Sequence, residues 1–205
     1  KATSAHSFQA IDVDFRRIED VRAARREAWA RQEGTSLTAL PFVARALCLA
    51  IVDFPRVNAS VEAENLIVHR HVNLAIAVDL DHEGLVAPVI ADAAAMPVPA
   101  LARAIRDLVA KARGGALGAD DVAGGTYTLS NAGAFGTLFT VPIINQPQVA
   151  ILSFDAVRKR AIVVTDGDED RIVVRPTAVL AQSFDHRAID GAYSAAFLAR
   201  VGEIV

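Results

Sequence analysis

Several stretches of the chain alternate apolar and polar residues, which is the pattern of strands buried on one face only. In residues 7–15, for example, Ile11, Val13 and Phe15 alternate with two aspartates. Other short apolar runs bounded by turn residues predict further strands. These are expected over residues 66–69, 72–79, 85–90, 126–130, 149–154, 159–164, 171–174 and 179–184, with a hairpin turn at Asp166-Gly167.

Apolar residues at helical spacing predict four helices. They are expected over residues 16–33, 39–52, 99–113 and after Gly191. The first carries many arginines and predicts a surface helix, whereas the second is apolar nearly all round and should be buried, with Thr38 as its cap. Because helices and strands mix without strict alternation, the sequence predicts one α/β or α+β domain over residues 1–205, built on a mixed sheet.

Composition narrows the classes of protein that fit. The 205 residues are 53% hydrophobic and 22% charged, which suits one folded domain with a sizeable core. A net charge of −3 does not suit a nucleic-acid-binding protein. The single Cys48 excludes an internal disulfide and a cysteine-based zinc site. No membrane-spanning stretch or signal peptide is evident, so we expect a cytoplasmic protein, and the start at Lys1 predicts a piece of a longer chain.

Several motifs of other enzyme classes are missing or incomplete. The sequence has no glycine-rich phosphate loop and no GxSxG turn. His69 and His71 share a predicted strand face, but no third metal ligand follows, so an exposed strand face is expected. The alternating aspartates of residues 166–170 resemble the start of a calcium loop, but Arg171 stands where that loop needs glycine. We therefore predict a hairpin turn there and no metal site.

The most polar strand exit, meaning the residues at and directly after the end of a predicted strand, surrounds His186. An apolar strand ends in Asp185, His186 and Arg187, and Asp190 and Gly191 follow. A neutral imidazole at such an exit could take a proton from a thiol or a hydroxyl, and the neighbouring carboxylates could fix its tautomer. On chemistry alone, a polar loop with a structural histidine is an equal alternative.

A second polar strand exit lies at Ser130 and Asn131, just before Gly133. A hydroxyl at this place could donate a hydrogen bond to a developing oxyanion. From the segment by itself, a Ser-Asn pair that initiates a turn is the favoured alternative.

Taken together, the sequences around these two strand exits resemble the motifs of one enzyme family. SFDHRAIDGA at residues 183–192 is similar to the DHRxxDG motif of the 2-oxoacid dehydrogenase acyltransferases, the E2 components, and GGTYTLSNAGAFG followed by PIINQPQVAIL is similar to their second motif. FPRVNAS, VNLAIAVD, GLVAPVI and KARGGAL extend the likeness over nearly the whole chain. The chain departs from the family at Ala75 and after residue 152, where glycine is common in the family but Ser153-Phe154-Asp155 stands here.

The resemblance implies a chloramphenicol-acetyltransferase-like fold in a homotrimer, within which the His segment of one chain faces the Ser segment of its neighbour. It implies acyl transfer between dihydrolipoamide and coenzyme A, with coenzyme A as substrate and the lipoyl group on a separate domain. It further implies a complex with E1 and E3 components, and a larger cage is open. The implied catalytic residues are His186 as general base, Asp190 in support and Ser130 at the oxyanion. The implied coenzyme A contacts are Arg22, Thr38, Asp79, Ser130 and Asn131.

Two other functions are open at this point. The chain could be a non-catalytic oligomeric scaffold, or a coenzyme A acyltransferase acting on a small hydroxylated acceptor. The presence of His186 favours a catalyst over a scaffold, and the stretches TLSN and PIINQPQ favour dihydrolipoamide as the acceptor. Acetyl, succinyl and branched-chain acyl groups all fit the sequence.

Overall fold

A mixed seven-stranded sheet forms the centre of the fold. The computed structural model describes residues 4–205. The strand order is β1-β11-β9-β8-β4-β7, with β10 paired to β11 outside this path. Strands β4, β8 and β9 run parallel, and the other pairs are antiparallel. The bounds are β1 (His6–Asp14), β4 (Leu74–Ile76), β7 (Val89–Ile90), β8 (Tyr127–Asn131), β9 (Ala150–Phe154), β10 (Arg158–Asp166) and β11 (Glu169–Asp185). The predicted α/β fold with a mixed sheet is confirmed.

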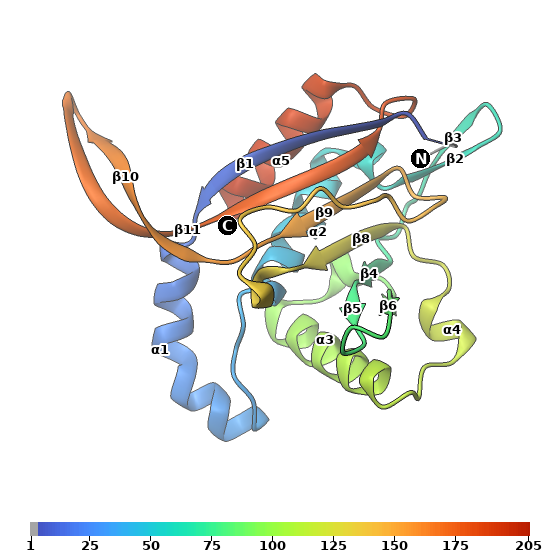
Figure 1. The fold of residues 1–205 in the computed structure, drawn as a ribbon, viewed down its shortest axis with the longest axis horizontal. Helices are drawn as coiled ribbons and strands as arrows, with labels where there is room; N and C mark the ends of the chain where they lie inside the picture. The colour runs from blue at the N-terminus through green and yellow to red at the C-terminus, as the bar shows by residue number, and fades with distance from the viewer. Residues whose placement is uncertain (1–3) are drawn as a thin grey trace.

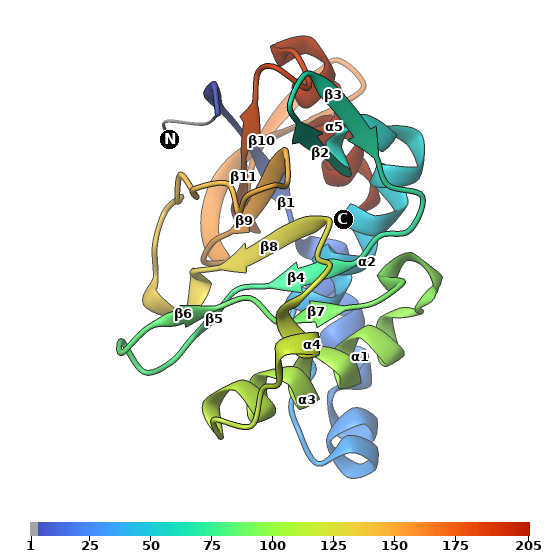
Figure 2. The same ribbon diagram turned by 90° about the vertical axis from the view of Figure 1, so that its right-hand side faces the viewer.

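In the described part of the chain, five helices accompany this sheet. They are α1 (Arg16–Glu33), α2 (Leu40–Asp53), α3 (Val98–Arg113), α4 (Ala119–Val122) and α5 (Gly191–Ile204), with 3-10 turns η1 (Pro55–Val57), η2 (Ala93–Ala95) and η3 (Gly133–Phe135). Helix α2 is the buried helix that its apolar sequence predicts, and it packs against α3 and α5. Figures 1 and 2 show α2 and α5 on the same side of the sheet. No helix within residues 4–205 is both long and apolar enough to cross a membrane.

One helix end agrees with its sequence signal, and one predicted helix cap is wrong. Helix α1 ends at Gly34, which adopts φ 67°, a left-handed conformation that favours glycine. The predicted cap of the buried helix is wrong. Ala39, not Thr38, stands before Leu40, and no side chain caps this end, although Pro41 lies in the first turn as expected. Thr38 is exposed, so its hydroxyl faces solvent rather than the helix.

Four predicted strands differ from the observed ones. Residues 72–79 divide into β4 and β5 (Val78–Asp79), and residues 85–90 divide into β6 (Leu85–Val86) and β7. Pro88, which has no N–H to donate, separates the second pair. Conversely, residues 171–174 and 179–184 belong to one strand, β11, because Pro176 falls where β11 exchanges β10 for other partners. Strands β5 and β6 pair only with each other, as do β2 (Ala59–Glu62) and β3 (Asn65–Val68).

Two features extend from this body. The hairpin of β10 and β11 projects beyond the rest of the sheet, and its turn is the predicted hairpin turn at Gly167 (Figure 1). The second feature is the crossover, defined here as residues 132–149. It returns the chain along the full length of the sheet, because β8 and β9 are parallel neighbours. Outward residues Phe139, Val141 and Ile143 are 50–64% exposed and alternate with inward residues.

Candidate active site

His186 stands at the open end of the longest strand. Strand β11 ends at Asp185, and the next residue projects its imidazole from the exit, where it is exposed. The backbone is held on both sides, because Asp185 N–H donates to Val149 O at 2.8 Å and His186 N–H donates to Ala5 O at 2.8 Å. The ring lies 5.7 Å from the ring of Phe184. A fixed backbone with an accessible imidazole is what a general base requires.

A buried carboxylate and an arginine flank this histidine. Asp185 is 1% exposed and accepts hydrogen bonds from the backbone N–H and the guanidinium of Arg187. Burial of Asp185 disfavours its charge, but the hydrogen bonds from Arg187 outweigh burial and hold the pKa of Asp185 below its usual range. The pair therefore fixes the turn that carries His186.

Asp190 lies four residues beyond the histidine, at the start of α5. Its Oδ1 accepts a hydrogen bond from Tyr193 N–H at 2.8 Å, so the carboxylate is the N-cap of the helix. In the structure this carboxylate therefore stabilises the start of the helix that follows the His186 turn.

Ser130 and Asn131 end β8 and are the two most exposed residues of that strand. Ser130 is half-buried, and Asn131 Oδ1 accepts a hydrogen bond from Gly133 N–H at 3.0 Å. This turn was the structural alternative that the sequence favoured. The two interpretations are compatible, because the turn engages the Asn131 carbonyl and leaves the Ser130 hydroxyl at the surface.

Within one chain, Ser130 and His186 lie at opposite ends of the sheet. Ser130 pairs with Ser153, and Ser153 pairs with Ala181. His186 is five residues further along β11, which at about 3.3 Å per residue is about 17 Å along the strand direction. The two side chains cannot both contact one thioester in the same chain.

The five sequence-predicted coenzyme A contacts do not gather in one cavity, and three of them line two neighbouring hollows. Thr38 and Asn131 line one cavity of about 520 Å³. Arg22 lines a neighbouring hollow and donates to Leu37 O at 2.8 Å. Asp79 lies on β5 and accepts from His82 N–H at 3.3 Å, and the His82 ring lies 5.7 Å from Phe135 in the turn after Asn131.

Sequence reasoning missed three residues of this cavity. Trp29 from α1 and two cations of α3, Arg106 and Arg113, line it together with Thr38 and Asn131. The seven-residue spacing of the two arginines places them on one helix face, and this signal could have identified them. An indole and paired guanidinium groups suit an aromatic ligand that carries phosphates.

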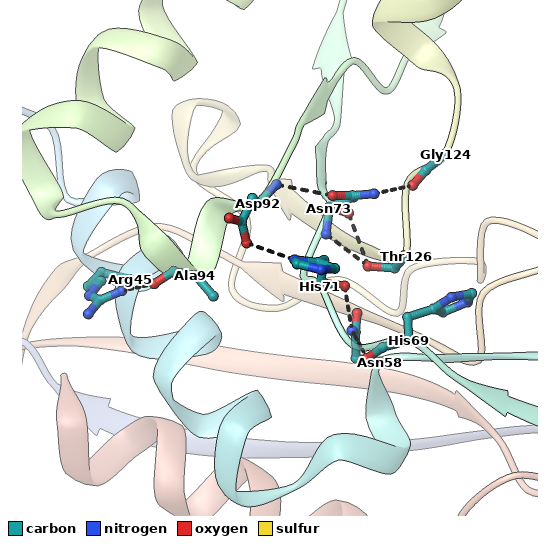
Figure 3. A network of polar contacts seen from close by, with 9 residues as sticks. All are labelled: Arg45, Asn58, His69, His71, Asn73, Asp92, Ala94, Gly124 and Thr126. Atoms are coloured by element: carbon teal, nitrogen blue, oxygen red, sulfur yellow. Dashed lines mark hydrogen bonds and ion pairs between the residues drawn. The ribbon is translucent and has the colours of Figure 1, made fainter.

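Hydrogen bonds from neighbouring segments hold the region of His69 and His71 in place (Figure 3). The predicted shared strand face is wrong, because β3 ends at Val68 and both histidines lie in the link that follows. Asn58 is 1% exposed and donates to the carbonyls of His69 and His71. His71 Nδ1 lies 3.4 Å from Asp92 Oδ1. In the part of the chain that the structure describes, no three metal-ligating side chains gather.

Comparison with known proteins identifies the family. Residues 1–205 match the family of 2-oxoacid dehydrogenases acyltransferase (catalytic domain). The chain belongs to this family. The dihydrolipoyllysine-residue acetyltransferase component of the pyruvate dehydrogenase complex of Corynebacterium glutamicum is 38% identical over 97% of this chain. The succinyltransferase component of the 2-oxoglutarate dehydrogenase complex of Bartonella vinsonii is 38% identical over 94%. The chain spans only 30% and 46% of these relatives' own lengths.

Solved structures agree with this family. A probable dihydrolipoamide acetyltransferase of Listeria monocytogenes superposes with a TM-score of 0.93 at 33% identity, covering 99% of this chain and 85% of that one. The cubic core of a pyruvate dehydrogenase multienzyme complex gives 0.91 at 33% identity, covering 99% and 82%. So does the dihydrolipoamide acetyltransferase of Azotobacter vinelandii at 32%, with the same coverage, and that structure concerns a serine, a histidine and an asparagine in the mechanism.

A more distant likeness defines the fold. Chloramphenicol acetyltransferase superposes with a TM-score of 0.61 at 12% identity, covering 98% of this chain and 88% of that one. At this identity the likeness concerns the fold alone. The chloramphenicol-acetyltransferase-like fold expected from the sequence is thereby confirmed.

Proposed function

We propose that this chain is the single catalytic domain of a dihydrolipoyllysine-residue acyltransferase, which moves an acyl group between dihydrolipoamide and coenzyme A. The observation that carries the proposal is the pair of strand exits. His186 projects from one end of the sheet and the Ser130 hydroxyl from the other, each within a motif of the family to which the chain belongs. In the Azotobacter protein the asparagine named with the histidine follows it by four residues, and Asp190 has this spacing here.

His186 would act as the general base. A thiol with a pKa of about 8.5 is only a few per cent thiolate at neutral pH. A neutral imidazole that takes the thiol proton allows sulfur to attack the thioester carbonyl. When the tetrahedral intermediate collapses, the other sulfur leaves and recovers the proton from the imidazolium. One proton thus passes from the attacking thiol to His186 and then to the leaving thiolate. No step needs a metal or an oxidant.

Ser130 would stabilise the oxyanion of that intermediate. The carbonyl oxygen gains negative charge in the transition state, where a fixed hydroxyl donor is worth more than in the ground state. The half-buried position of Ser130 at the end of β8 supports this role, because strand pairing fixes its backbone while its side chain stays partly accessible.

Since the two groups lie about 17 Å apart along the strand direction within one chain, the proposed site is shared between two copies. His186 of one copy would face Ser130 of the next, in the homotrimer that the family resemblance implies. The outward side of the crossover supports such an interface. Phe135, Leu138, Phe139, Val141 and Ile143 are 50–64% exposed along one segment, and exposed apolar patches of this kind mark interaction surfaces.

The cavity beside Asn131 is the proposed entry of coenzyme A. Thr38 and Asn131 line it, and Arg113 would meet its phosphates. Arg106 lines the same cavity, but its guanidinium is paired with Glu33 and Asp107, so it would have to exchange these partners to bind a phosphate. The dihydrolipoyl group would come from the lipoyl domain of a 2-oxoacid dehydrogenase complex and approach from the His186 side, and the E1 and E3 components of that complex are the expected partners. The cubic core among the similar structures supports such an assembly.

An acyl-transfer assay tests the proposal. Purified protein is mixed with dihydrolipoamide and acetyl-, succinyl- or isobutyryl-coenzyme A, and thioester formation is followed. Transfer from one of the three supports the proposal and identifies the acyl group. Transfer only to a hydroxylated acceptor would indicate another class of acyltransferase, and an oligomer without any transfer would indicate a scaffold.

A further inference from the structure

A completely buried carboxylate lies beside the Ser130 strand. Asp155 follows the last residue of β9 and is 0% exposed. It belongs to the stretch Ser153-Phe154-Asp155, in which the sequence departs from the glycine that often follows residue 152 in the family. A buried carboxylate is costly unless hydrogen bonds compensate for lost hydration, so its retention here requires an explanation.

Four donors surround the Asp155 carboxylate. Oδ1 accepts from the hydroxyls of Thr137 and Thr140, the latter at 2.8 Å. Oδ2 accepts from Thr140 N–H at 3.1 Å and from the Ser153 hydroxyl at 3.2 Å. Among residues 4–205 no cation pairs with this carboxylate. Asp155 therefore binds a segment of the chain rather than an arginine or lysine.

That segment is the beginning of the crossover, directly after Ser130 and Asn131. The segment also meets the end of β9 through its backbone, because Ala132 N–H donates to Phe154 O at 3.2 Å and Ala156 N–H donates to Thr137 O at 3.3 Å. A Cβ added to Gly133 would lie 3.0 Å from Asp155 O, so the turn packs tightly against the backbone of Asp155 at this glycine. The turn is thus attached to the end of β9 and the two residues that follow it.

The hydrogen bonds of Asp155 also reach Ser153, the residue that is paired with Ser130 in the sheet. Ser130 and Ser153 are paired on adjacent parallel strands, so their side chains lie on one face. Ser153 is 0% exposed, and its single hydroxyl proton is shared between Asp155 Oδ2 at 3.2 Å and Thr140 O at 3.0 Å. The residue beside Ser130 and the turn after it are therefore both held by Asp155.

We infer that Asp155 is a positioning residue that holds the Ser130 hydroxyl in the place where it stabilises the oxyanion. This rests on the role proposed for Ser130. Loss of the carboxylate would leave the Ser130 hydroxyl present but free the turn that orients it. Because misplacement of about 1 Å can cost about a hundredfold in rate, loss of Asp155 is expected to lower kcat by about ten- to a hundredfold.

A double-mutant cycle tests the inference. Asp155→Asn keeps the size of the side chain but replaces one acceptor oxygen by a donor. The kcat and the KM for coenzyme A are measured for Asp155→Asn, Ser130→Ala and the double variant. If Asp155 acts through Ser130, each single change lowers kcat, Asp155→Asn affects kcat more than KM, and the double variant is no slower than Ser130→Ala.

Two results would overturn the inference in distinguishable ways. If Asp155→Asn lowers kcat by the same factor with and without Ser130, Asp155 does not act through it, and the role of Ser130 stands. If Ser130→Ala leaves kcat unchanged, the proposed role of Ser130 fails first. Should Asp155→Asn not fold, Thr137→Val and Thr140→Val each remove one donor and enter the same cycle.

A matched control separates positioning from stability. Tyr127 lies on the same strand as Ser130 but on its other face, and its hydroxyl donates to Gln182 Oε1 at 2.7 Å in the core. Tyr127→Phe removes one buried hydrogen bond without touching the crossover. It should lower the unfolding midpoint and leave kcat within about twofold of the unmodified protein. An equal loss of kcat in Tyr127→Phe would mean that buried hydrogen bonds in general, not Asp155, determine the rate.

Discussion

Arg187 Nη2 lies 2.6 Å from Asp185 Oδ2, and the ion pair bridges the two neighbours of His186. The aspartate is almost completely buried, whereas the arginine side chain is 44% exposed. The pair therefore lies at the boundary between core and solvent, where it can hold the backbone of the strand exit while the imidazole between the two residues stays accessible.

This pair predicts a change in acid stability. The pKa of Asp185 lies below its usual value in the folded protein, so ionised Asp185 stabilises the fold above its unfolded pKa, and this contribution is lost as pH falls through the folded pKa. In Arg187→Ala, burial and the backbone N–H donor of residue 187 remain but the guanidinium hydrogen bonds are gone, so the pKa of Asp185 rises. Acid unfolding, followed by circular dichroism, is expected at a higher pH than in the unmodified protein.

The chain offers a control on the same strand. Arg171 pairs with Glu169 at the same two-residue spacing, but these side chains are 61% and 74% exposed. Because exposed pairs contribute little, Arg171→Ala should leave the acid midpoint almost unchanged. Equal shifts in the two variants would mean that net charge, and not the burial of Asp185, sets acid stability.

His186→Ala should cost more in turnover than any other single change. General-base catalysis is typically worth about 10²- to 10⁴-fold, and an exposed side chain contributes little to folding. We expect kcat to fall by this order while light scattering shows the same oligomer. His71→Ala is the control, because His71 is also exposed beside a carboxylate, Asp92. Near-normal turnover of His186→Ala would exclude the general-base mechanism.

Local patterns predicted most of the elements, because periodicity depends on near neighbours in the chain. The helix over residues 16–33 begins and ends as expected, and the first strand is displaced by one residue. The strand breaks at Ala77 and Pro88 were missed, because apolar side chains continue through both. The continuity of β11 was missed for the opposite reason, since Pro176 is a local break signal that a change of partner strand overrides.

The site residues came from motifs, but their separation could not come from local sequence. Ser130 and His186 both follow apolar strands, and nothing near either residue says which strands pair. Their placement at opposite ends depends on β9, which is parallel to β8 and antiparallel to β11. The role of Asp155 was hidden for a similar reason, because the threonines that it binds lie 15 and 18 residues away.

Substitutions of Asp190 distinguish a role as helix N-cap from a catalytic role of its negative charge. As N-cap of α5 it accepts from Tyr193 N–H, and loss of such a cap costs about 1 kcal/mol. Asp190→Ala should therefore lower the free energy of unfolding in urea by about this amount, whereas Asp190→Asn should keep both the cap and the turnover. A large loss of kcat in Asp190→Asn, with stability unchanged, would assign a catalytic role to the negative charge.

Ser130→Ala tests the oxyanion donor. Removal of one such donor typically lowers kcat by about 10²- to 10³-fold. Because the hydroxyl acts on charge that develops only in the transition state, the Kd for coenzyme A, measured by calorimetry, should change little. If Ser130→Ala raised KM and Kd together and left kcat unchanged, Ser130 would be a binding residue.

The opposite placement of Ser130 and His186 leads to the last prediction, complementation between two inactive variants. His186→Ala and Ser130→Ala chains are mixed, unfolded and refolded together. If the site is shared, some interfaces will combine an intact His186 with an intact Ser130, and activity will rise well above that of either variant refolded alone. If each chain held a complete site, every site would lack one group, and the mixture would stay at the level of the variants. Light scattering must confirm trimers, and mass spectrometry must confirm mixed composition. Mixed trimers without a gain in activity would exclude a shared site. The separation of about 17 Å along the strand direction would then require a different base near Ser130, for which His82 beside Asp79 is the candidate to mutate.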